Sequence, residues 1–283
     1  MQPSPSSAST AATPNDVSAA TWVAFTLGPL LREVVATALA GLVTGIVVLG
    51  LGGRLVMRAA TLLDPGAIGR LTENGNRIGD ITLGGTVALI LFGGMFFGLG
   101  AAIVWTAIWR WLPQQPIRRA LVAMPVAVAV SGFLLVEGDN PDFRILDLQP
   151  IVIGLLLGLI ALFGAVLALV DAAFQRRLPA VRPERLRVAG GYALLVGLGA
   201  VLVLPFIVGF YFSADICFCR PERPTGTAIA VAGGATIVAW LLRANGRDPR
   251  PPALVAVGRT AVVAAVVLGS LRVIEEIRVI LVA

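Results

Sequence analysis

Two hydrophilic stretches of the chain carry side chains that could bind an ion or a phosphate group. The first begins with Arg54 and Arg58, which are four residues apart and therefore share one face of a helix. The second follows residue 136 and is rich in carboxylates. Guanidinium pairs bind phosphate, and carboxylates bind cations or transfer protons. The candidate polar site across both stretches comprises Arg54, Arg58, Arg70, Glu73, Arg77, Asp80, Glu137, Asp139 and Asp142.

The same stretches also support a purely structural interpretation. Asn-Gly at 74–75 and Asp-Asn-Pro at 139–141 are typical turn sequences. The ligand spacing of a calcium-binding loop and its terminal Glu are absent after residue 136. We therefore favour turns and surface ion pairs, expect no metal site, and assign no catalytic residue.

Two further charged residues, Asp171 and Arg259, lie within apolar segments or at their edges. An ionisable side chain in hydrocarbon is costly and is expected to have a partner. We therefore predict that Asp171 pairs with Arg259. This pair would be structural, or would form part of a proton or ion path.

Missing residue types exclude several kinds of chemistry. The chain contains no His and no Lys, and its two cysteines are Cys217 and Cys219. This composition excludes a Ser-His-Asp triad, histidine ligation of zinc or haem, a lysine Schiff base and a P-loop. A disulfide between residues two apart would close a small, strained ring. We expect a free thiol pair or a bond to a partner subunit, and no cofactor. These absences favour a protein that is not an enzyme and leave enzymatic activity open.

The composition is that of a membrane protein. Hydrophobic residues make up 57% of the chain and charged residues 13%, and mean hydropathy is +0.90. Soluble domains carry about 25% charged residues. The chain has seven apolar stretches of about 20 residues, the length that crosses a bilayer. These predicted spans lie near 34–57, 82–108, 118–136, 151–173, 189–212, 226–242 and 253–271.

The predicted fold is therefore all-α, a polytopic transmembrane helix bundle of about seven spans. Residues 1–20 are rich in Ser, Ala, Pro and Thr, so we predict a disordered N-terminal tail there, followed by a single transmembrane domain over residues 21–283. Small residues recur four apart in several spans, which allows close helix packing. Packing within one bundle is the simpler interpretation, and a dimer face is the alternative. These pairs are Gly41 and Gly45, Gly94 and Gly98, and Gly154 and Gly158.

The distribution of arginine predicts the orientation. A net charge of +6 could indicate a nucleic-acid partner, but no basic stretch is interleaved with aromatic residues, so we expect none. Eleven arginines lie in the loops after the second, fourth and sixth predicted spans. By the positive-inside rule these loops and the N-terminus are cytoplasmic, and the polar stretches are outside. The first span is an exception, because more arginines follow it than precede it.

Four segments resemble a block found in bacterial multi-pass membrane proteins of no established activity. These segments are GGRLVMR (52–58), TENGNRIGDITLGGT (72–86), LFGG (91–94) and EGDNPDF (137–143). The resemblance implies a fold shared among bacterial inner-membrane proteins, and it supplies no catalytic residue.

Three functions follow from these patterns. The favoured one is a non-enzymatic accessory or scaffolding protein whose outer polar loops contact lipid, a membrane protein partner or a second copy of the chain. The second is a small-solute or ion permease that uses Asp171 and Arg259. The third is a lipid-phosphate enzyme that uses Arg54, Arg58 and Glu73.

Overall fold

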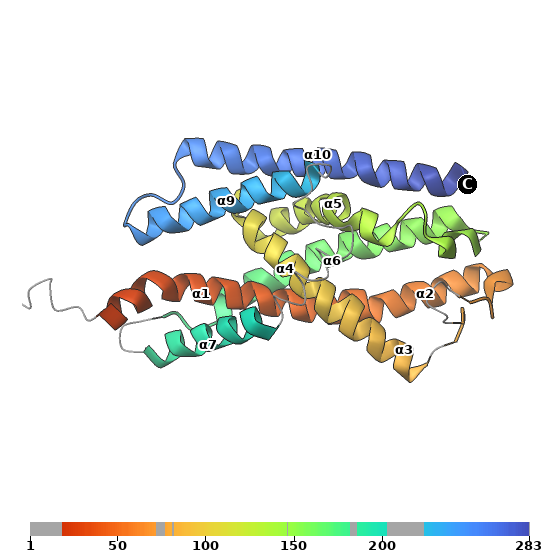
Figure 1. Cartoon of the computed structure of the whole chain (residues 1–283), viewed down its shortest axis with the longest axis horizontal. Coiled ribbons are helices and arrows are strands. Elements are labelled where there is room, and N and C mark those ends of the chain that lie inside the picture. The colour runs from red at the N-terminus through yellow and green to blue at the C-terminus, as the bar shows by residue number, and fades with distance from the viewer. Residues whose placement is uncertain are drawn as a thin grey trace, which may run out of the picture.

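The computed structural model describes residues 19–71, 77–80, 82–145, 147–181, 186–202 and 224–282 (Figure 1). Within these residues the chain is helical, and extended pairing is limited to one isolated bridge between Leu71 and Arg77. The predicted all-α bundle is confirmed. The predicted tail lies mostly outside the described residues, and the first helix already begins at Ala19.

The first span is one long helix. It consists of α1 (Ala19–Thr44), a π-helical segment η2 (Gly45–Leu51) and α2 (Gly52–Leu63). This helix is longer at both ends than the predicted span 34–57, because residues 19–33 and 58–63 continue the same helix.

The second span is also composite, and the later spans are simple helices. It runs through α3 (Leu83–Ala88), the π-helical η4 (Leu89–Phe96), α4 (Phe97–Ile108) and the 3-10 turn η5 (Trp109–Trp111). The remaining helices are α5 (Pro116–Leu135), α6 (Gln149–Arg177), α7 (Leu186–Leu202), α9 (Pro224–Ala244) and α10 (Pro252–Val282). Short 3-10 turns η3 (Pro65–Ala67) and η6 (Pro141–Ile145) lie in the connections.

Among the described residues, six helices are long and apolar enough to cross a membrane, and they match six of the predicted spans. The predicted span 189–212 begins in α7, and its part beyond residue 202 lies outside the described residues. Extensive helix–helix contacts join α5 to α6, α9 to α10, and α1 to both α4 and α6.

The connections gather at two ends of the bundle (Figure 1). One end, the arginine-rich end, holds the start of α1, the α4–α5 and α9–α10 connections, the end of α6 and the start of α7. The other, the mixed-charge end, holds the α2–α3 connection, the α5–α6 connection and the end of α10. These described connections alternate between the two ends as the sequence predicts, and the connection from α7 to α9 lies outside the described residues.

The first two spans cross through glycine backbones. A Cβ atom placed on Gly45 would lie 2.0 Å from the carbonyl oxygen of Gly94, and one placed on Gly41 would lie 2.3 Å from that of Gly98. Without side chains at the crossing, the backbones approach closely, as lipid-embedded helices require for tight packing. These small residues therefore pack within the bundle. By contrast, Gly154 and Gly158 have no atom of the described chain near their Cβ positions.

Candidate functional site

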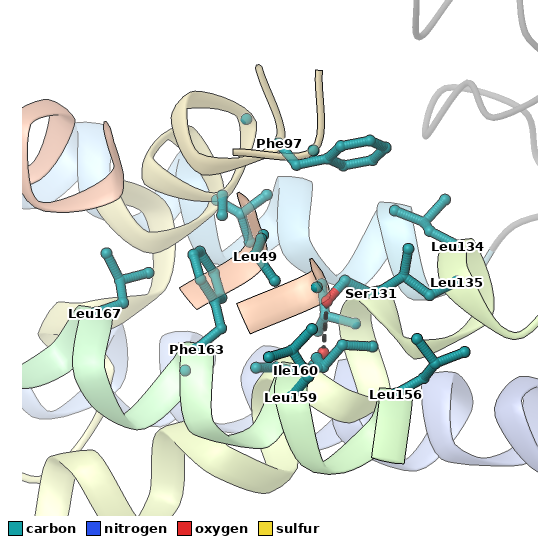
Figure 2. Close-up of a pocket in the computed structure, with 18 of the residues that line it drawn as sticks. Leu49, Phe97, Ser131, Leu134, Leu135, Leu156, Leu159, Ile160, Phe163 and Leu167 are labelled. Carbon is teal, nitrogen blue, oxygen red and sulfur yellow. Dashed lines mark hydrogen bonds between the residues drawn. The ribbon is translucent and has the colours of Figure 1, made fainter. Parts of the chain in front are cut away.

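An apolar groove runs along the inside of the bundle, with the second span on one side and α5 on the other (Figure 2). Its volume is about 380 Å³, within the range of ligand pockets in proteins. Residues of α6 and of the η2–α2 segment complete the wall. The side chains drawn there include Leu49, Phe97, Ile160, Phe163 and Leu167.

The groove has different lengths along the helices that line it. Along α6 its lining runs from Leu156 to Leu167, along α5 from Leu135 back to Ala123, and along the second span from Leu89 to Ile108. At a rise of 1.5 Å per residue the first two segments are about 16–18 Å long and the third is about 28 Å long. The hydrocarbon core of a bilayer is about 30 Å thick. The groove therefore covers about half of that thickness beside α5 and α6 and most of it beside the second span.

The groove offers almost no hydrogen-bonding capacity to a ligand. No charged residue lines it, and the side-chain polar groups in its wall are the Ser131 hydroxyl and the Trp105 indole. Ser131 donates to the Ala127 carbonyl at 2.7 Å (Figure 2), and Trp105 Nε1 donates to Asp171 Oδ2 at 3.2 Å. Both donors are already engaged, so the groove suits an apolar chain better than a polar solute.

Two of the predicted site residues lie directly beside this groove. Gly53 and Met57 are part of its wall, and Arg54 and Arg58 follow them in α2. Arg54 is half-buried and Arg58 is exposed. The Arg54 guanidinium lies against the start of α3, because a Cβ placed on Gly85 would be 2.6 Å from Arg54 Nη2.

The other members of the candidate polar site are dispersed over the mixed-charge end. Glu73 lies outside the described residues. Asp142 is half-buried, and its backbone N–H donates to Asn140 Oδ1 at 2.8 Å in a turn, as the Asp-Asn-Pro sequence predicts. The exposed members are Arg70, Arg77, Asp80, Glu137 and Asp139.

The two polar stretches do meet, but through other residues. The buried Asp64 carboxylate accepts a hydrogen bond from the backbone N–H of Asp147 at 2.7 Å. Glu276 of α10 accepts one from the backbone N–H of Gly138 at 2.8 Å, and it also pairs with Arg272. These contacts hold the connections in place and favour the structural interpretation of the acidic stretch.

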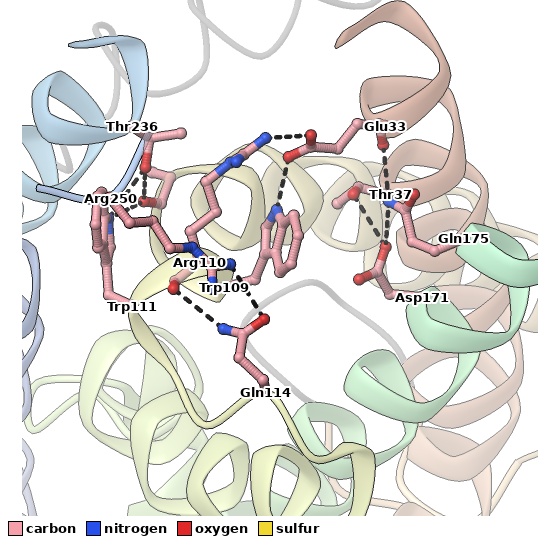
Figure 3. A network of polar contacts seen from close by, with 11 residues as sticks. Glu33, Thr37, Trp109, Arg110, Trp111, Gln114, Asp171, Gln175, Thr236 and Arg250 are labelled. Atoms are coloured by element: carbon pink, nitrogen blue, oxygen red, sulfur yellow. Dashed lines mark hydrogen bonds and ion pairs between the residues drawn. The ribbon is translucent and has the colours of Figure 1, made fainter. Parts of the chain in front are cut away.

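Asp171 is fully buried near the arginine-rich end, and its partners are neutral (Figure 3). Its carboxylate accepts from Thr37 Oγ1 at 3.0 Å, Trp105 Nε1 at 3.2 Å and Gln175 Nε2 at 3.4 Å. The prediction that Asp171 pairs with Arg259 is wrong, because Arg259 is exposed on α10 whereas Asp171 faces α1 and α4. Hydroxyl, indole and amide donors stabilise the buried carboxylate in place of the cation that we predicted.

A buried ion pair between Glu33 and Arg110 lies next to Asp171, and the sequence argument missed it (Figure 3). Trp109 Nε1 donates to Glu33 Oε1 at 3.1 Å, and the Arg110 guanidinium lies 5.2 Å from the Trp109 ring centre. Gln175 Nε2 donates to the Glu33 carbonyl at 3.3 Å, which links this pair to Asp171. Glu33 is the one acidic residue between positions 17 and 63. A single acid in so long an apolar segment indicates a buried partner, and this feature of the sequence could have identified the site.

Further hydrogen bonds at the arginine-rich end secure the helix connections. Arg119 Nε donates to the Pro113 carbonyl at 3.0 Å, and Arg250 Nη2 donates to Gln114 Oε1 at 3.2 Å. Trp111 Nε1 donates to Thr236 Oγ1 at 3.1 Å, which joins η5 to α9. Each donor or acceptor meets a complementary group of a neighbouring segment. We therefore assign this network to the assembly of the bundle.

Comparison with protein-family models, curated proteins and solved structures finds no match for this chain. The resemblance to bacterial multi-pass membrane proteins therefore stays a prediction. The assignment of function depends on the groove and on the charged residues beside it.

Proposed function

We propose that this integral membrane protein is a non-enzymatic accessory protein that holds the acyl chain of a membrane lipid in its internal groove. The observation that carries the proposal is the chemistry of the groove wall. Its lining is apolar along all the helices that form it, and its two side-chain polar groups are bonded within the protein. An acyl chain matches such a wall in shape and polarity.

The groove supports lipid binding better than it supports a permease. A path for a polar solute or an ion needs hydrogen-bonding groups or charges along its wall. Asp171 does not line the groove, is fully buried, and is bonded to three neutral donors. The Trp105 ring lies between Asp171 and the groove, because it lines one and donates to the other.

We also propose that the arginine-rich end faces the cytoplasm of a bacterial cell, with the mixed-charge end outside. The support is the clustering of the cationic connections at one end of the bundle (Figure 1). In this orientation the part of the groove beside Leu135, the last residue of α5, lies toward the outer leaflet of the inner membrane.

Lipid retention tests the proposal directly. The protein is extracted in mild detergent and washed extensively with lipid-free detergent. Native mass spectrometry then shows whether a stoichiometric phospholipid remains bound. Ala101→Phe places a bulky ring in the groove, and Ile103→Phe, on the lipid-facing side of the same helix, is the matched control. Val104→Trp is a second groove-filling change.

We expect the wild-type protein and Ile103→Phe to retain one lipid, and both groove-filling variants to retain about tenfold less, because no apolar space remains for the chain. Monodisperse elution in gel filtration shows that each variant is folded. Equal retention by all four proteins, or no retained lipid in the wild type, would contradict the proposal.

A further inference from the structure

We infer that Arg54 and Arg58 bind the phosphate of an anionic phospholipid whose acyl chain lies in the groove. This inference rests on the proposed function, and it specifies the class of lipid. Its starting point is the register of α2, in which each arginine follows a residue of the groove wall. Gly53 precedes Arg54, and Met57 precedes Arg58.

This register places both cations at the edge of the groove rather than inside it. Successive residues of an α-helix point about 100° apart. Arg54 and Arg58 therefore project from one face of α2, and Gly53 and Met57 project from the adjoining face. A chain lying against Gly53 and Met57 would bring the headgroup attached to it next to the two guanidinium groups.

Arg54 lacks the partners that a half-buried guanidinium requires. Its Nε atom is buried and has no hydrogen-bond acceptor. Neither Arg54 nor Arg58 takes part in the ion pairs that join Arg110 to Glu33 and Arg272 to Glu276. A cation in a membrane-spanning helix is costly without a counter-charge, so its presence points to an anionic ligand.

The geometry of guanidinium favours a phosphate as that ligand. Arginine offers several N–H donors in one plane, and it forms paired hydrogen bonds with phosphate oxygens. The nearest acid in the sequence, Asp64, accepts a hydrogen bond from the backbone N–H of Asp147. Two neighbouring cations prefer a headgroup of net negative charge to one that brings its own ammonium.

Position distinguishes a lipid phosphate from free phosphate. Arg54 lies in a membrane-spanning helix, beside the turn that contains Gly85 and next to the apolar wall. A free phosphate ion would have to leave water to reach the Nε atom of Arg54. A lipid phosphate is already held at the boundary of the hydrocarbon, and its chain adds the apolar contact.

The test compares two lipids with the same acyl chains, phosphatidylglycerol and phosphatidylcholine, added in turn to delipidated full-length protein. Binding is measured by native mass spectrometry. The variants are the double substitution Arg54→Gln with Arg58→Gln, and Gly85→Ala, whose added methyl group would displace the Arg54 guanidinium. Arg278→Gln, at an exposed arginine near the end of α10, is the control for the loss of a surface arginine.

We expect wild type and Arg278→Gln to prefer the anionic lipid by about tenfold. The double variant should bind both lipids equally, and Gly85→Ala should lose part of the preference. A double variant that keeps the full preference would overturn the assignment of Arg54 and Arg58. Displacement of the anionic lipid by inorganic phosphate would show that the arginines bind free phosphate rather than a lipid headgroup.

Failure of the headgroup inference is distinguishable from failure of the proposed function. If the arginines are not the headgroup site, the wild type still retains lipid and Ala101→Phe still reduces that retention. If the groove holds no acyl chain, neither lipid binds the wild-type protein, and the inference falls together with the proposed function.

Discussion

Trp105 belongs to the groove and to the buried polar network at the same time. Its ring lines the groove, and its indole N–H donates to the Asp171 carboxylate at 3.2 Å. Asp171 in turn accepts from Thr37 of α1, so a single carboxylate fixes the positions of α1 and α4 relative to α6. The groove wall is therefore anchored by hydrogen bonds that lie behind it.

Replacing Trp105 with Phe should destabilise the protein while leaving lipid retention intact. The ring still covers the wall, but Asp171 loses one donor. A hydrogen bond between membrane helices contributes about 0.6 kcal/mol on average and up to about 1.7 kcal/mol. We expect the free energy of unfolding, measured by thermal denaturation of the detergent-solubilised protein, to fall by about 1 kcal/mol. Trp240→Phe is the control, because Trp240 Nε1 is buried without an acceptor, and a loss as large there would contradict this reasoning.

Asp171 and Arg259 should differ sharply in their effect on stability. Asp171→Leu removes a carboxylate that accepts three hydrogen bonds and leaves the Thr37 and Trp105 donors unpaired, which should cost about 2–4 kcal/mol. Arg259→Gln changes an exposed side chain and should cost less than about 0.5 kcal/mol. Unfolding midpoints of the two variants provide the comparison, and similar losses would restore a link between the two residues.

The Glu33–Arg110 pair should behave as a coupled unit. Removing one partner, as in Glu33→Leu or Arg110→Met, leaves a buried charge without its counter-charge, and we expect a loss of about 3–5 kcal/mol for each. The double variant should be less destabilised than the sum of the two, because no buried charge remains. A double-mutant cycle on unfolding free energies measures this coupling. Simple additivity would mean that the pair contributes nothing as a pair.

Glycines at the crossing of the first two spans should tolerate no side chain. Gly45→Leu drives a side chain into the Gly94 carbonyl, so we expect failure to fold or a large fall in the yield of monodisperse protein. Gly158→Leu is matched in chemistry, but its Cβ position has no neighbour in the described chain. It should express like the wild type. Loss of the Gly158 variant alone would indicate a partner on that face of α6.

Cysteine labelling checks the orientation. In a background with Cys217 and Cys219 replaced, single cysteines are introduced at Asn140 and Asn245, which lie in connections at opposite ends of the bundle. A membrane-impermeant maleimide applied to intact cells should label the cysteine at 140 and spare the one at 245. The reverse pattern would place the mixed-charge end inside, together with Arg54 and Arg58.

The sequence predicted the helices well because the hydropathy of a segment depends only on the residues that it contains. Long apolar runs mark the spans, and the alternation of arginine-rich loops matches the two ends of the fold. The partner of Asp171 was mispredicted because charge alone was considered, whereas Thr37, Trp105 and Gln175 satisfy the carboxylate as neutral donors. The groove was not foreseeable, since it depends on how far apart α4 and α5 lie.

The glycine crossing between Gly45 and Gly94 also bears on how the protein is made. Its contact involves backbone atoms, so no side-chain rotamer has to be fixed when the two helices associate. All of its residues precede position 99, and α5 begins only at Pro116. The first two spans can therefore dock during synthesis, before the helices that complete the groove have entered the bilayer.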